Sequence, residues 1–214
     1  MYLCNVFDKP RVERACTLSR GENAYIPMKQ RWFEQDTWNE EIEDFFFLKI
    51  SRSQKELASQ YIRVQAIKFL SMPNEKLNNV AHRLIQILFD SYPERYMDIM
   101  FCHEALADFY YSKEEYENSF SHYETIRNYN SSSQNARYCT ITSELGMLKC
   151  LLKIKHSSKK QLVKELINEM LPYLNNNFQF FDNIRKDFIT VCRQINQLLK
   201  DDEIENIIKI IEGK

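Results

Sequence analysis

The sequence predicts an all-α fold built as a stack of antiparallel helix pairs, with about nine helices in all. Three glycines and five prolines in 214 residues leave little material for the many turns of a β-rich fold. Beyond residue 35, apolar residues recur at spacings of three and four, which is the period of amphipathic helices. Helix pairs recur roughly every 40 residues, and such a period is typical of stacked repeat units that contact mainly their neighbours.

The most motif-like stretch is the predicted helical hairpin Cys102–Ile126. Its first half carries Leu106 and Tyr110 at helical spacing, with the small residue Ala107 beside them. Ser112 followed by Glu115 predicts a capping box at the start of the second helix. The second helix has an apolar face with the same spacings, formed by Tyr116, Ser119, Phe120, Tyr123 and Ile126.

This hairpin resembles a tetratricopeptide repeat, a helix–turn–helix unit of about 34 residues. The residues at the positions of that pattern are Leu106, Ala107, Tyr110, Tyr116, Ser119 and Tyr123. The hairpin departs from the pattern in that His103 replaces the usual Trp, Ile126 replaces a small residue, and no Pro closes the unit. The resemblance implies a right-handed α-solenoid whose concave face holds a protein or peptide. The ligand-facing positions that it implies are Phe101, Glu104, Asp108, Tyr111, Ser112, Thr140, Ser143 and Met147.

The remaining helices follow from the same periodicity. We expect helices at about 36–48, 53–70, 74–92, 94–111, 113–128, 136–152, 158–173, 178–199 and 202–211. Further capping pairs are predicted at Thr37/Glu40, Ser53/Glu56, Ser158/Gln161 and Asp202/Glu205. The polar run at 128–135 is predicted to be a loop. Ile204, Ile207, Ile208 and Ile211 form one stripe, which is typical of a terminal helix that seals a stack.

Two regions are predicted from these patterns. Residues 1–35 form an irregular N-terminal arm with a short helix around Arg11–Leu18, and the alternative that they are the remnant of a truncated domain stays open. Residues 36–214 form the repeat domain, which ends in the C-terminal capping helix.

Charge, cysteine content and the pattern of apolar residues restrict both the partners and the cell compartment that we expect. The net charge is −1, with 29 basic and 30 acidic residues, which argues against a general nucleic-acid binder. Six scattered cysteines with no closely spaced pair favour a reduced, intracellular protein. The first residues lack the pattern of a signal peptide, and no run of about 18 apolar residues exists. We therefore expect a cytoplasmic protein that does not enter a membrane.

Candidate catalytic chemistry is sparse. Glu104 and Asp108 are four residues apart on one helix, so with a histidine such as His122 they form the best candidate metal ligands. Cys102 and His103 point about 100° apart as neighbours on a helix, which does not suit a nucleophile and its base. With three glycines, the chain has no phosphate-binding glycine loop.

We therefore expect no enzyme activity, cofactor or metal, and predict a non-enzymatic scaffold or regulator that binds a protein or peptide on its concave face. The carboxylates of Glu104 and Asp108 favour a basic segment as the partner. Two alternatives stay open: a toxin-neutralising immunity protein, and a metal-dependent enzyme that uses Glu104, Asp108 and a histidine. The sequence does not determine the oligomeric state.

Overall fold

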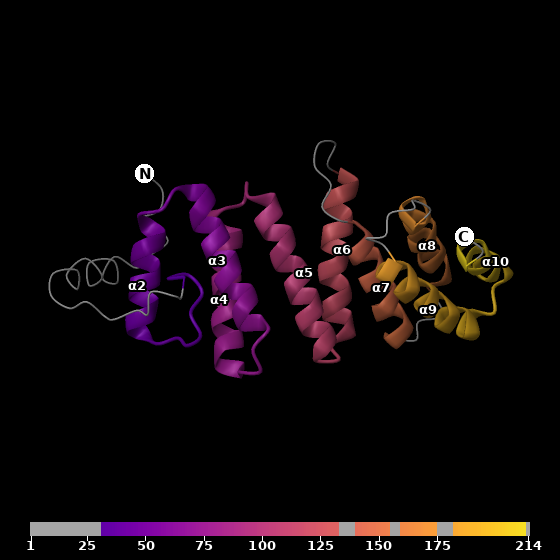
Figure 1. Cartoon of the computed structure of the whole chain (residues 1–214), viewed down its shortest axis with the longest axis horizontal. Coiled ribbons are helices and arrows are strands. Elements are labelled where there is room, and N and C mark those ends of the chain that lie inside the picture. The colour runs from indigo at the N-terminus through magenta and orange to yellow at the C-terminus, as the bar shows by residue number, and fades with distance from the viewer. Residues whose placement is uncertain (1–30, 133–139, 155–158, 175–181, 213–214) are drawn as a thin grey trace. The chain divides into compact units, whose positions relative to one another are not determined.

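The computed structural model of the chain describes residues 31–132, 140–154, 159–174 and 182–212, and these residues form nine helices without a strand (Figure 1). The helices are α2 (Glu40–Ser51), α3 (Lys55–Leu70), α4 (Glu75–Ser91), α5 (Tyr96–Ser112), α6 (Tyr116–Ser132), α7 (Thr140–Ile154), α8 (Lys160–Leu174), α9 (Asp182–Leu199) and α10 (Asp202–Glu212). The prediction of an all-α protein is confirmed. Within these ranges no helix is long and apolar enough to cross a membrane.

The chain divides into two compact units, and the division falls inside α5, between Ala105 and Leu106. Unit 1 contains α2, α3, α4 and the first part of α5. Unit 2 contains the end of α5 and the helices α6 to α10. The predicted solenoid stacking and its handedness stay predictions.

The core of unit 1 lies where α3 packs against α4 and α2 (Figure 1). Phe46 of α2, Ile62 and Phe69 of α3, and Leu84 of α4 are fully buried there. A short turn separates α3 from α4, and the Asn74 side chain caps α4 by accepting the backbone N–H of Leu77. The predicted break at this point is confirmed.

The segment 31–36, here called the strap, lies along α3. The backbone N–H of Gln35 donates to Oε1 of Gln65 at 2.5 Å, and Nε2 of Gln65 donates to the carbonyl of Gln35 at 3.1 Å. The ring of Phe33 stacks on Tyr61 with a centroid distance of 4.4 Å. These contacts satisfy the buried amide of Gln65 and fix the strap on unit 1. The predicted helix around Arg11–Leu18 lies outside the described residues.

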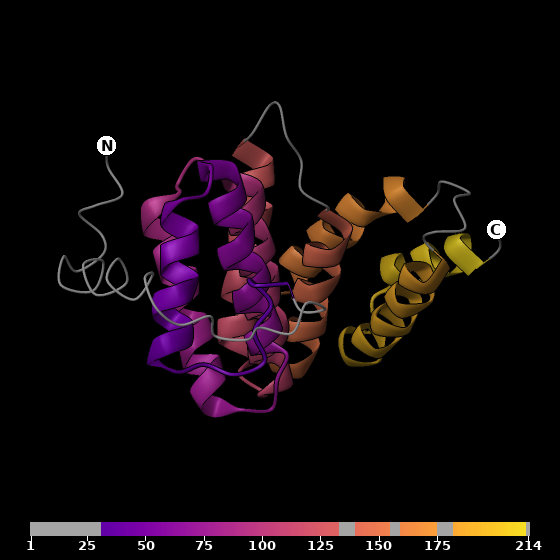
Figure 2. The ribbon, with the colours of Figure 1, turned by 60° about the vertical axis from the view of Figure 1, so that its left-hand side comes forward.

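Unit 2 is built on α7, which packs against α6, α8 and α9, while α10 packs against α9 (Figure 2). The apolar stripe predicted for the last helix is confirmed, because Ile204, Ile208 and Ile211 are buried. Leu106, Ala107, Ser119 and Tyr123, which carry the repeat pattern, are buried as well.

The predicted capping pairs are wrong in the described residues. Asn39 rather than Thr37 caps α2, and its side chain accepts the N–H of Ile42. The residue before α3 makes no side-chain cap, and the Ser53 hydroxyl donates instead to the carbonyl of Lys49. At α10, Asp201 rather than Asp202 accepts the N–H of Glu203. Ser158 lies outside the described residues.

The turn between α5 and α6 also differs from the prediction. Ser112 is the last residue of α5, so it does not cap α6. The chain turns at Glu114, which has a φ of 62° in the left-handed region. The N–H of Glu115 donates to the carbonyl of Tyr110 at 2.9 Å, and the N–H of Glu114 to that of Tyr111 at 3.1 Å. This pair of bonds is a Schellman motif, which normally carries Gly at the left-handed position.

The predicted loop at 128–135 is wrong over its first residues, because α6 continues to Ser132. Asn130 is buried within this part of α6, so tertiary packing overrides the low helix propensity of the polar run. The rest of the predicted loop lies outside the described residues.

Candidate binding face on unit 1

A buried carboxylate holds α5 against α3. Asp98 accepts the hydroxyl of Ser59 at 2.7 Å, and Nε of Arg63 lies 2.9 Å from its other oxygen. Nε of Arg95 lies 3.5 Å from the first oxygen. A buried charge needs such partners, and together they offset much of its desolvation cost. Ser59 and Arg63 of α3 are therefore held against the first turn of α5.

Arg63 also contacts an aromatic ring of α5. Its guanidinium lies 4.6 Å from the ring centroid of Phe101, which is a favourable cation–π geometry. This contact places the ring of Phe101 next to α3.

The surface on both sides of this contact is mainly apolar, and we call it the α3–α5 face. On α3 its residues have spacings of three, four and three, which places them on one side of the helix. Leu57 is 40% exposed and Met97 is 39% exposed, and the other members are partly exposed. The residues of the face are Leu57, Gln60, Val64 and Ile67 of α3 and Met97, Phe101 and Glu104 of α5.

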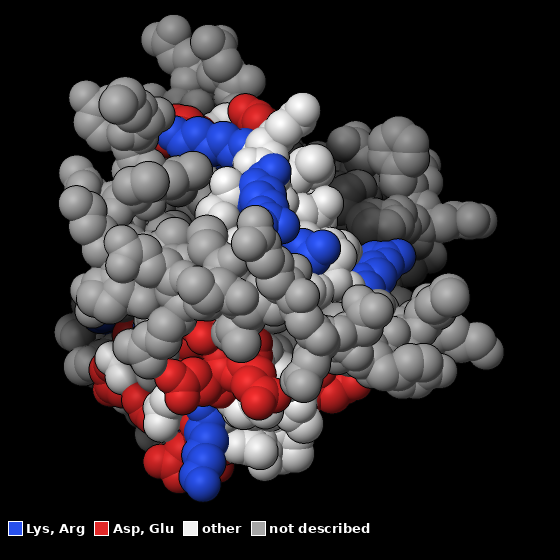
Figure 3. All heavy atoms as spheres, turned by 90° about the vertical axis from the view of Figure 1, so that its left-hand side faces the viewer, with Lys and Arg blue, Asp and Glu red and all other residues white. Residues whose placement is uncertain are grey.

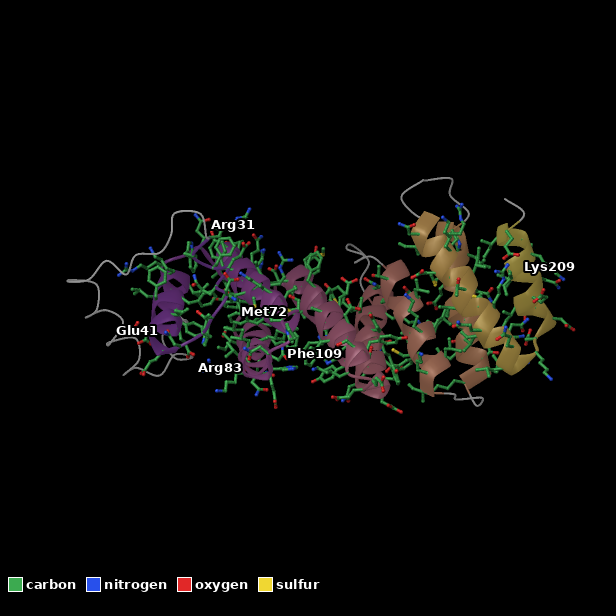
Figure 4. The ribbon with its side chains drawn as sticks, turned by 60° about the horizontal axis from the view of Figure 1, so that its bottom comes forward. Arg31, Glu41, Met72, Arg83, Phe109 and Lys209 are labelled. Atoms are coloured by element: carbon green, nitrogen blue, oxygen red, sulfur yellow. The ribbon has the colours of Figure 1, made fainter. Side chains whose placement is uncertain are left out.

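The strap borders this face along α3. Its rings pack on Tyr61, and Nζ of Lys68 lies 2.5 Å from the carboxylate of Asp36. Figure 4 shows Arg31, the first residue of the strap, at one edge of unit 1 and Arg83 at the opposite edge. The strap thus borders the face on the side of α3 that carries Tyr61 and Lys68.

The charged start of α2 is only partly solvated. Glu40 and Glu41 are exposed, but Glu43 is buried. Its carboxylate accepts Nε1 of Trp38 at 2.7 Å and two guanidinium nitrogens of Arg83. Figure 3, which views the side that carries α2, shows acidic side chains gathered mainly in its lower part, with a basic side chain among them, and basic side chains mainly in its upper part. The acidic first turn and the basic last turn of α2 match the helix dipole, and they need no ligand to explain them.

Of the predicted concave positions, only Phe101 and Glu104 lie on the α3–α5 face. In unit 2, Asp108 is exposed and accepts the hydroxyl of Tyr123, and Ser112 is exposed with its hydroxyl bonded to the carbonyl of Phe109. Tyr111 is partly buried in an edge-to-face contact with Tyr116, at a centroid distance of 5.3 Å.

Two of the three predicted positions on α7 are not accessible. Ser143 is 1% exposed and Met147 is fully buried, so the structure puts both in the core of unit 2 and not on an exposed face. The reason is that α7 has three neighbouring helices and is covered on most of its circumference. The side chain of Thr140 lies outside the described part of the chain.

The histidines on α5 and α6 pack against aromatic rings. His103 stacks on Phe89 at a centroid distance of 4.8 Å, and His122 stacks on Tyr110 at 5.5 Å. In the described ranges no three His, Cys, Asp or Glu side chains come together in a way that suits a metal. Burial raises the pKa of Cys102 to about 12, so this thiol is not an activated nucleophile.

Five residues of the face were missed by sequence reasoning: Leu57, Gln60, Val64, Ile67 and Met97. Leu57 and Tyr61 are apolar neighbours of Ala58 and Ile62 in the sequence, although only the latter two are fully buried. The signal that marks the face is a series of α3 residues with spacings of three, four and three, which begins at Leu57 and runs beside the buried residues of the same helix.

Comparison of the chain with models of protein families, with curated proteins and with solved structures finds no match.

Proposed function

We propose that the protein is a non-enzymatic binding module that holds a protein or peptide segment on the α3–α5 face. The observation that carries this proposal is the exposure of Leu57 and Met97 at the two sides of a mainly apolar surface. Exposed apolar side chains that gather on one face are typical of protein interaction sites. The Asp98 network fixes the two helices, so little ordering is needed when a partner binds.

The chemistry of the face suggests the chemistry of its partner. Val64, Ile67 and Phe101 suit apolar side chains, and Glu104 at the end of the face suits a Lys or Arg. In a tetratricopeptide-like stack, α3 and α5 would be the first helices of consecutive pairs, and such helices line the concave side. A peptide that combines apolar residues with a basic residue is thus the partner class that we propose.

The test is selection from a displayed library of random peptides, followed by affinity measurement. Wild-type protein is the bait, and the selected peptides are titrated against Val64→Glu, which puts a charge at the centre of the face. Gln86→Glu adds the same charge at an exposed position of α4 and serves as the matched control. We expect Val64→Glu to weaken binding at least tenfold, about 1.4 kcal/mol, while Gln86→Glu binds as wild type does.

Thermal unfolding of both variants separates binding from folding. Val64 is partly exposed, so its replacement should leave Tm within a few degrees of wild type. A library that yields no peptide, or peptides that bind both variants equally, contradicts the proposal.

A further inference from the structure

Met97 differs in exposure from the other methionines of the described residues. It is 39% exposed in the first turn of α5, whereas Met100, three residues later in the same helix, is 3% exposed. Met147 and Met170 in unit 2 are buried as well. Met72 is partly exposed, but it lies in the turn between α3 and α4 and outside the α3–α5 face. Of these methionines, Met97 alone is both exposed and part of the face.

The packing of α5 on α3 fixes the place of Met97 on the face. Met97 directly precedes Asp98, which accepts the hydroxyl of Ser59 on α3 at 2.7 Å. Phe101 follows one turn later on the same side of α5, and its ring contacts α3 through a cation–π interaction. Met97 is therefore held near the start of α3, where Leu57 is also exposed. A partner that lies across Leu57 and Phe101 buries the side chain of Met97 as well.

The sulfur of an exposed methionine reacts with peroxides. A lone pair of the sulfur attacks one oxygen of hydrogen peroxide, so that an S–O bond forms and the O–O bond breaks. The second oxygen leaves as water after it takes up the proton of the transferred oxygen. The sulfur loses two electrons, and the peroxide gains them. The product, methionine sulfoxide, is polar, and methionine sulfoxide reductases return it to methionine.

We propose that Met97 is a reversible oxidation site that controls binding at the α3–α5 face, an inference that rests on the binding function proposed above. In the reduced form, its flexible and polarizable side chain packs against apolar groups of the peptide. In the oxidised form, the sulfoxide oxygen loses its water when a peptide covers it, and the side chains of Leu57 and Phe101 offer it no hydrogen-bond donor. Oxidation thus releases the peptide, and reduction restores binding.

The first measurement follows the oxidation of each methionine in the full-length protein and needs no partner. The protein is treated with hydrogen peroxide, a thiol reductant then reverses the reversible oxidation of its cysteines, and mass spectrometry locates the sulfoxides. We expect Met97 to be oxidised roughly ten times faster than Met100, because burial protects Met100 in the same helix. Equal rates for the two residues overturn the inference, whether or not a peptide binds.

The second measurement compares the affinity of a library-selected peptide for the reduced and the oxidised protein. Oxidised wild type should bind at least roughly tenfold more weakly, and treatment with methionine sulfoxide reductases should restore the affinity. Met97→Leu keeps an apolar side chain without sulfur, so it should bind equally before and after oxidation. Met72→Leu is the matched control, because it removes the partly exposed methionine outside the face. It should lose binding on oxidation as wild type does.

These variants separate failure of the inference from failure of the proposed function. A peptide that is weakened by Val64→Glu but binds oxidised wild type equally well overturns the role of Met97 and leaves the binding function in place. Loss of binding on oxidation of Met97→Leu also overturns it, because another residue is then responsible. If no peptide binds the reduced protein, the proposed function fails, and the inference fails with it.

Thermal unfolding distinguishes a change at the face from damage to the fold. Met97 is exposed, so oxidised wild type should keep its Tm within a few degrees of the reduced protein. The same holds for reduced Met97→Leu. A collapse of Tm on oxidation shows that binding is lost through unfolding, and this result contradicts a switch at the face.

Discussion

The ring of Tyr123 on α6 lies directly against Gly146 on α7. A Cβ atom at position 146 would sit 2.5 Å from Cε2 and 2.7 Å from Cε1 of that ring, closer than real contacts allow. The ring has little freedom to move away, because Tyr123 is buried and its hydroxyl donates to Asp108. The absence of a side chain at Gly146 thus sets how closely α6 and α7 approach.

Gly146→Ala should therefore destabilise the protein by roughly 1–3 kcal/mol, the usual cost of overpacking. This loss outweighs the gain of up to about 1 kcal/mol that Ala brings to a helix interior. Urea unfolding measures the difference. In a Tyr123→Leu background the same substitution should cost much less, and an equal cost in both backgrounds would show that the ring is not the obstacle.

Glu114 occupies a left-handed backbone position that suits glycine, with a φ of 62°. Glu114→Gly should raise the free energy of unfolding by about 1 kcal/mol, because it removes the strain of a side chain at positive φ. Glu117→Gly, three residues later in the first turns of α6, is the control and should lower stability by about 1 kcal/mol. Chemical denaturation of both variants checks the opposite signs, and a loss of stability in Glu114→Gly contradicts this account of the turn.

Asp98 is the carboxylate on which the contact between α3 and α5 depends. Asp98→Ala leaves Arg63 and Ser59 without their partner in a partly buried site, and it should cost roughly 2–4 kcal/mol. Asp187→Ala breaks an exposed pair with Lys149 and should cost less than about 1 kcal/mol. Equal effects in thermal or urea unfolding would show that burial does not set the strength of the Asp98 network.

Asp201 should give the protein an acid-side pH dependence of stability. Hydrogen bonds from Lys160 and Lys164 hold its pKa well below the usual range. A depressed pKa stabilises the fold above the unfolded value, near 4, and this contribution is lost as pH falls toward the lower folded value. Asp201→Asn should thus have a lower Tm than wild type at pH 7, and the gap should narrow from about pH 4 to pH 2. A gap that is constant with pH contradicts this assignment.

The spacing of apolar residues shows which residues of a helix share a face, and this determines which features of the fold the sequence could predict. Three of the four residues predicted for the stripe of α10 are buried, because burial of one helix face leaves a direct trace in the sequence. The cap at Asn39 was missed, because several polar residues near the start of a helix can cap it. The turn at Glu114 was missed, because nothing in the sequence marks a Glu that adopts a left-handed backbone conformation.

The candidate site was predicted less well, for a different reason. Periodicity shows that a helix has apolar stripes, but it does not show which stripe another element covers. On α3 the covered stripe includes Ile62 and the open one includes Val64, and the two differ only in tertiary contacts. On α7 the repeat pattern placed Met147 on a face, whereas three neighbouring helices bury it.

Methyl NMR gives the most direct test of the α3–α5 face, because Leu57, Val64, Ile67 and Met97 all carry methyl groups. A library-selected peptide is titrated into methyl-labelled full-length protein. The exposed methyl groups of Leu198 and Ile210 in unit 2 serve as internal controls. We predict that the peptide shifts the methyl resonances of these four residues and leaves those of Leu198 and Ile210 in place. Shifts confined to Leu198 and Ile210, or to other methyl groups of unit 2, would contradict the proposal that this face is the binding site.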